Sequence, residues 1–197
     1  MTPHTAQPLL VAGVGNIFLG DDAFGPEVIR ALDRRPLPSG AHVRDFGIRG
    51  MDLAYALLGG CATAVLVDAA PRGQRPGTLS LVEAEPPDDT VVPEAHGMDP
   101  QKVLALATHL GDEPLPRVLV LACEPAVLPS PDEDIAPGLS EPVREAVERA
   151  VDALHTLVPV LLADPAASAP PLGRPMESGP PHAAALPGRG AGGAEDR

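Results

Sequence analysis

Two patterns of hydrophobic residues alternate along the chain. Short, nearly continuous apolar runs predict β-strands at 9–13, 42–46, 63–68, 78–82 and 117–122. Between them, apolar residues at helical spacing predict helices around Val28 and Ile29, over 51–58, and after the capping residues Asp99 and Ser140. Strands that alternate with helices indicate an α/β fold, with a mostly parallel sheet covered by helices on both faces.

The composition changes at Asp164, which divides the chain into two parts. From Asp164 to Arg197, 21 of 34 residues are Pro, Gly or Ala, and few large apolar side chains remain. Such a segment cannot bury enough apolar surface to offset the entropy lost on ordering. We therefore predict one folded domain over 1–163 and a disordered tail over 164–197.

The overall charge and the two cysteines limit which partners and which cellular compartment fit the protein. A formal net charge of −13 disfavours nucleic acids and anionic membranes as partners, because their phosphates would be repelled. Cys61 and Cys123 form no CxxC pair, which is typical of a reducing compartment. There is no signal-like start and no apolar run of membrane-spanning length, so we expect a cytoplasmic location.

Four polar residues follow or close the predicted strands: Asp22, Asp45, Asp68 and His96. Ligands of open α/β sheets bind at the carboxyl ends of the strands, so this edge should bring the four together. Two or three carboxylates and one imidazole form either a divalent-metal site or a general acid–base site. Each residue also has an ordinary explanation, because Asp21 or Asp22 could cap a helix, Asp45 and Asp68 could close turns, and His96 could be a loop histidine.

Other chemistries fit the sequence poorly. The stretch that begins Gly13-Val14-Gly15 lacks the third glycine of a dinucleotide-binding fingerprint, because Phe18 stands there. The chain contains no G-x-S-x-G motif, so the nucleophile of an α/β-hydrolase is absent. Both cysteines are expected to be packed in the interior.

Several segments together resemble the hydrogenase maturation proteases. These are GVGNIFLGDDAFG at 13–25, RDFGIRGMDL at 44–53, VLVDAA at 65–70, EAHGMDPQKVL at 94–104 and VLACEP at 120–125, with GLSEPV at 138–143 like the start of the family's last helix. The resemblance covers about residues 9–158. It implies a three-layer α/β/α sandwich and an endopeptidase that removes the C-terminal extension of a nickel-loaded nickel-iron hydrogenase large-subunit precursor.

By this resemblance, Asp22, Asp68 and His96 would contact a metal, and that metal would be the nickel of the substrate. Asp45 matches an acidic residue of the family's D-G-G-x-x-G block, in which Phe46 here replaces the first glycine. We expect Asp22, Asp45 and Asp68 to supply the catalytic carboxylates, and no organic cofactor. Two alternatives remain at this point: a non-catalytic nickel-sensing assembly factor that uses the same site, and a metal-dependent hydrolase of a small molecule.

Overall fold

The computed structural model describes residues 9–85, 99–112, 114–128, 137–169 and 172. They form a five-stranded sheet with the order β2-β1-β3-β5-β4. The strands are β1 (Leu9–Val14), β2 (Ala41–Gly47), β3 (Thr63–Ala69), β4 (Leu79–Glu83) and β5 (Arg117–Cys123). All neighbouring strands are parallel except β4, which pairs antiparallel to β5. The predicted mostly parallel sheet is therefore confirmed.

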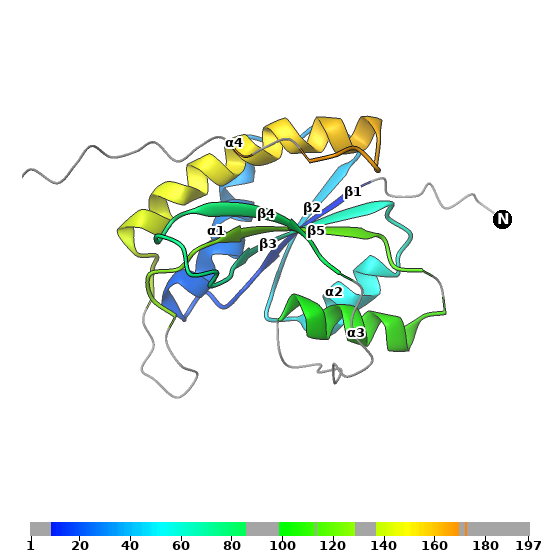
Figure 1. Ribbon diagram of the computed structural model, residues 1–197, viewed down its shortest axis with the longest axis horizontal. Helices are drawn as coiled ribbons and strands as arrows, with labels where there is room; N and C mark the ends of the chain where they lie inside the picture. Colours follow the sequence, from blue (N-terminus) through cyan, green and yellow to red (C-terminus); the bar gives the residue numbers. More distant parts are fainter. Residues whose placement is uncertain (1–8, 86–98, 113, 129–136, 170–171, 173–197) are drawn as a thin grey trace, which may run out of the picture.

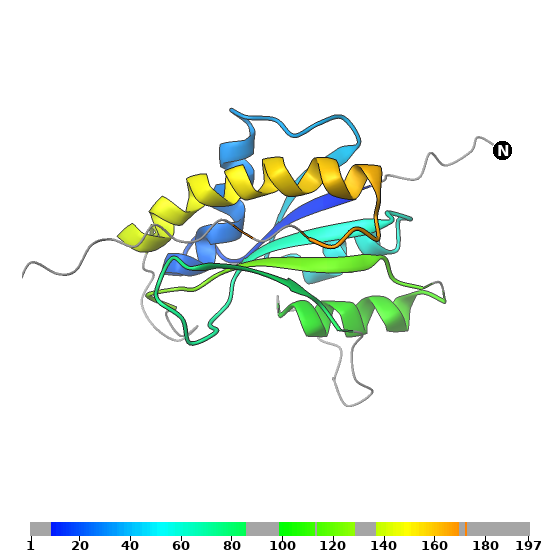
Figure 2. The same cartoon turned by 45° about the horizontal axis from the view of Figure 1, so that its top comes forward.

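Helices cover both faces of this sheet (Figure 1). They are η1 (Gly20–Ala23), α1 (Phe24–Leu32), α2 (Gly50–Leu57), α3 (Pro100–Leu110) and α4 (Glu141–Ala163). α1 and α4 lie on one face and α2 and α3 on the other, an arrangement that remains clear in the turned view of Figure 2. The three-layer α/β/α sandwich is confirmed. No helix within the described ranges has the length and apolar character needed to cross a membrane.

The hydrophobic core consists of two layers, because side chains alternate across the buried strands. In β3, Val65 and Val67 pack on the α1 and α4 side, whereas Ala64 and Leu66 pack on the α2 and α3 side. Asp68 continues the second series, so the alternation places it on the face that α3 covers. A strand that is apolar on both faces thus ends in a carboxylate.

The predicted helix caps differ in their outcome. Asp99 caps α3 as expected, since its Oδ1 accepts the backbone N–H of Gln101 at 2.9 Å. Ser140 is the N-cap residue of α4, as predicted, but its side chain makes no capping hydrogen bond to that helix. Its hydroxyl donates instead to Asp21. The residue that precedes α1 is Ala23, so neither Asp21 nor Asp22 caps that helix.

The last helix ends at Ala163, immediately before the composition changes. The described residues that follow still contact the domain. Arg117 Nη1 donates to the backbone carbonyls of Pro165 and Ala167, at 3.0 and 2.8 Å. Leu172 is half-buried against the core on the α4 side. Residues 173–197 lie outside the described part of the chain, so the disorder expected of the tail stays a prediction.

Candidate functional site

The carboxyl ends of β1, β2, β3 and β5 meet at one edge of the sheet, here called the rim (Figure 1). Asp22 lies in η1 after β1, Asp45 near the end of β2, and Asp68 at the end of β3. These three carboxylates therefore occupy the same edge, as the sequence predicted. His96 lies outside the described residues.

Asp22 is held by the tight turn that joins β1 to η1. Gly15 in this turn has φ +128°, and a Cβ there would stand 1.8 Å from the Asp22 carbonyl oxygen, so only glycine fits. The backbone N–H of Asn16 donates to Asp22 Oδ2 at 2.7 Å. Burial raises the pKa of this half-buried carboxyl, and the Asn16 hydrogen bond opposes the shift. The turn thus fixes the position of the Asp22 carboxylate.

Asp68 is the most perturbed acid of the site. Asp68 is 7% exposed, and burial raises its pKa well above the usual range. The negative charge of Asp22 raises this pKa further, and a hydrogen bond from the Ala69 amide opposes both effects. Two carboxylates that repel one another in a partly dry site favour sharing a proton or binding a cation.

The start of α3 completes this electrostatic environment. The charge of Asp99 also raises the pKa of Asp68, so the first turn of α3 lies within electrostatic reach of the strand end. His96 precedes Asp99 by three positions in the sequence. Across the described ranges, no three His, Cys, Asp or Glu side chains come together as a metal-binding group. The described geometry therefore supplies the carboxylate pair, and the imidazole remains a prediction.

Asp45 has a more open environment than the other two acids. It is exposed, and its Oδ1 accepts the backbone N–H of Gly47, the last residue of β2, at 2.8 Å. Phe46, which stands where the D-G-G-x-x-G block has its first glycine, is fully buried in the core on the α2 and α3 side. The substitution therefore adds to the core, and Asp45 stays on the rim in contact with solvent.

Asp21 has a role that the sequence did not reveal. Its carboxylate is fully buried and accepts four hydrogen bonds of 2.7–2.9 Å. The donors are the backbone N–H groups of Ala126, Val127 and Ser140, and the Ser140 hydroxyl. All of them are more than 100 positions away in the chain, so no local pattern distinguishes Asp21 from Asp22. Asp21 is structural, and Asp22 carries the available carboxylate.

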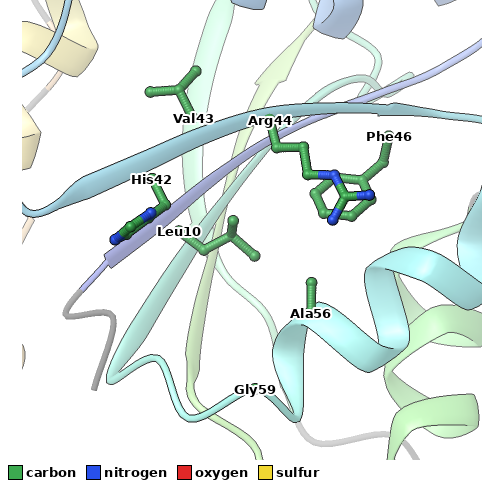
Figure 3. A pocket seen from close by; sticks show the side chains of 7 residues that line it. All are labelled: Leu10, His42, Val43, Arg44, Phe46, Ala56 and Gly59. Atoms are coloured by element: carbon green, nitrogen blue, oxygen red, sulfur yellow. The ribbon is translucent and has the colours of Figure 1, made fainter. Parts of the chain in front are cut away.

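A separate hollow lies between β2 and α2 (Figure 3). This pocket has a volume of about 370 Å³ and is lined by Leu10, His42, Val43, Arg44, Phe46, Ala56 and Gly59. The Arg44 guanidinium lies 4.8 Å from the centre of the Phe46 ring. None of the three rim carboxylates lines the pocket, so it does not belong to the carboxylate site.

The cysteines do not provide a nucleophile. Cys61 and Cys123 are both buried, as predicted. Burial raises the pKa of Cys61 and raises that of Cys123 to about 12. Since the thiolate is the reactive form, both thiols are inert at neutral pH. Among the described residues of the rim, the chemistry available is therefore that of carboxylates.

Comparisons with known proteins agree with this geometry. The family model described as hydrogenase maturation protease matches residues 26–156. The chain is 32% identical over 157 residues to the hydrogenase expression/formation protein HoxM of Azotobacter vinelandii, covering 75% of this chain and 70% of that protein. The hydrogenase maturating endopeptidase HybD of Escherichia coli has a similar structure, with a TM-score of 0.60 and 25% identity over 80% of this chain and 94% of its own. A hydrogenase 2 maturation peptidase from a Thaumarchaeota archaeon gives a TM-score of 0.53 at 30% identity, over 79% and 97% of the two chains.

The α/β fold and these matches together place the chain among the peptidases. The chain belongs to the hydrogenase maturation protease family. It is accordingly an endopeptidase of hydrogenase maturation.

Proposed function

We propose that this endopeptidase removes the C-terminal extension of a nickel-iron hydrogenase large-subunit precursor after nickel has been inserted. Asp22, Asp68 and His96 would engage the nickel that the substrate carries. The observation that supports this most directly is the electrostatic coupling of Asp22 and Asp68 on the rim. Family membership supports the hydrogenase precursor as the partner.

The carboxylate pair suits a cation that arrives with the substrate. Without a cation, Asp68 is buried beside a second negative charge, which disfavours its ionised form. A divalent cation would neutralise this repulsion, and the carboxylates of Asp22 and Asp68 would then both become its ligands. Carboxylate oxygens with one imidazole nitrogen are compatible with nickel and with zinc, so the donors alone do not select the metal. Selectivity would follow from the metal that the precursor carries.

Hydrolysis then requires an activated water beside the scissile peptide. Docking of the nickel would position that peptide on the rim, which makes the attack effectively intramolecular. Asp45 is the candidate general base, because its carboxylate is exposed at the same edge. It would take a proton from water as the water oxygen attacks the carbonyl carbon. The proton would pass to the leaving amide nitrogen when the tetrahedral intermediate collapses. These steps need no organic cofactor.

The two cysteines bear on the cellular compartment in which the enzyme works. Cys61 and Cys123 are free and buried within the described residues, which suits a reducing compartment. We infer that the precursor is processed in the cytoplasm.

Incubation with purified precursor tests the proposal. The wild-type protein should shorten nickel-loaded large-subunit precursor of its source organism and leave nickel-free precursor intact. Mass spectrometry of the product would identify the cleaved bond. The alternative, a non-catalytic nickel-sensing assembly factor, predicts binding of the loaded precursor with no change in its mass.

A further inference from the structure

Exposed apolar side chains lie on the loops of the rim. Five large hydrophobic residues on its loops are 42–58% exposed, namely Ile17, Phe18, Ile48, Val127 and Leu128. We call this set the apolar rim surface. Keeping such side chains in water is unfavourable, and a cluster of them marks an interaction site more often than isolated ones do.

Hydrogen bonds connect the three loops that carry this surface. The backbone N–H of Gly15 donates to the Gly47 carbonyl at 3.0 Å, which joins the loop of Phe18 to that of Ile48. On the other side, Asp21 exchanges hydrogen bonds with Val127, whose backbone carbonyl accepts at 3.2 Å and whose N–H donates at 2.8 Å. The apolar side chains therefore belong to one connected set of loops.

The same loops hold the candidate catalytic acid. Asn16 donates its backbone N–H to Asp22, while its own side-chain oxygen accepts the N–H of Phe18 at 3.0 Å. Asn16 thus links the Asp22 carboxylate to the backbone of Phe18, an exposed aromatic residue. Because the turn is fixed by these bonds, the position of the Phe18 backbone is set before any partner binds. Such preorganisation lowers the entropy lost on association.

We propose that the apolar rim surface docks an apolar segment of the precursor polypeptide next to the scissile bond. This inference rests on the proposed function, which places a polypeptide at Asp22 and Asp68. A peptide bond that reaches these carboxylates must approach over the loops that surround them. The rim acids would repel an acidic segment, so the segment that fits combines apolar side chains with neutral or basic neighbours.

Substitution of exposed residues can test this surface without disturbing the core. Phe18→Ser and Ile48→Ser remove one apolar side chain each from the rim. Leu110→Ser is the matched control, because Leu110 is 41% exposed but lies in the last turn of α3, at the end away from Asp99. Biolayer interferometry with nickel-loaded precursor gives Kd, and initial cleavage rates give KM and kcat. Each rim variant should raise Kd and KM about tenfold with kcat nearly unchanged, as expected when one buried apolar anchor is lost from an interface. Leu110→Ser should match wild type.

The outcomes separate this inference from the proposed function. If wild type cleaves the precursor and the rim variants behave like Leu110→Ser, the docking surface is refuted and the protease function stands. If wild type binds without cleaving and the rim variants bind more weakly, docking stands and the proposed cleavage fails. Absence of both binding and cleavage refutes both. A wild-type dimer in sedimentation velocity that Phe18→Ser dissociates would show that a second copy covers this surface, which also overturns the inference.

Discussion

Ser140 donates both its backbone N–H and its hydroxyl to the buried carboxylate of Asp21, at 2.7 and 2.9 Å. The two residues are 119 positions apart in the chain. This contact joins the start of α4 to η1, the short helix that also carries Asp22. The Asp21 carboxylate therefore holds the start of α4 against the segment that carries the candidate site.

Asp21→Ala should destabilise the domain strongly. The substitution removes the buried acceptor of four part-buried hydrogen bonds, and we expect a loss of about 2–4 kcal/mol in the free energy of unfolding. Urea denaturation at neutral pH measures it. Glu145→Ala, at an exposed position of α4, is the control and should change stability by less than about 0.5 kcal/mol. Equal stabilities of the two variants would show that the Asp21 contacts contribute little.

Asp68→Asn should abolish processing while the fold stays intact. The amide preserves the shape of the strand end but removes the charge and weakens an oxygen ligand. We expect cleavage of nickel-loaded precursor to fall about 100-fold or more. Normal cleavage by well-folded Asp68→Asn would exclude Asp68 from the site.

The same substitution should change how stability depends on pH. The pKa of Asp68 is raised in the folded protein, so folding favours its protonated form. The contribution of Asp68 to the stability of the fold is fully present below its ordinary pKa of 3.8. This contribution is lost as the pH rises through the raised pKa of the folded protein. At neutral pH, metal-free Asp68→Asn should therefore melt at a higher temperature than wild type, and this gap should shrink as the pH falls towards 3.8. Melting curves across this window test the effect, and a gap that does not change with pH would contradict it.

His96→Ala should fold normally and fail to cleave nickel-loaded precursor. A loop histidine without function would tolerate alanine or glutamine with stability changes within about 0.5 kcal/mol. A metal ligand would not, because neither replacement supplies an imidazole nitrogen. Processing assays on His96→Ala and His96→Gln, with circular dichroism as the folding control, distinguish the two roles. An active His96→Ala enzyme would remove His96 from the proposed trio.

The end of the chain should be largely dispensable. Truncation after Leu172 keeps the contacts of Arg117 and of Leu172 with the domain, so melting temperature and processing should match those of the full chain. Truncation after Ala163 also removes these contacts and should cost about 2 kcal/mol in the free energy of unfolding, since two hydrogen bonds and one half-buried leucine are lost. A large drop in melting temperature after the first truncation would show that residues 173–197 pack on the domain.

The elements of this fold could be predicted from the sequence because their signals are local. Apolar runs and helical spacing depend on neighbours a few positions away, so the five strands and the helix predicted over 51–58 were located to within one residue at each end. The starts of α3 and α4 were likewise predicted, at Asp99 and Ser140. Parallel strands end at the same edge of a sheet, and this rule alone predicts that Asp22, Asp45 and Asp68 lie on one rim.

Only the tertiary structure shows the features of the site that depend on residues far apart in the sequence. The neighbouring acids Asp21 and Asp22 look alike in the sequence, and only the return of the chain at Ala126 and Ser140 buries the first and leaves the second available. Ser140 was correctly placed at the N-cap position of α4, but the partner of its hydroxyl could not be predicted, because Asp21 is far away in the chain. The raised pKa of Asp68 likewise arises from burial and from charges on separate elements, which no local pattern encodes. Local periodicity determines where strands and helices form, whereas burial and charge at the site arise only when remote segments pack together.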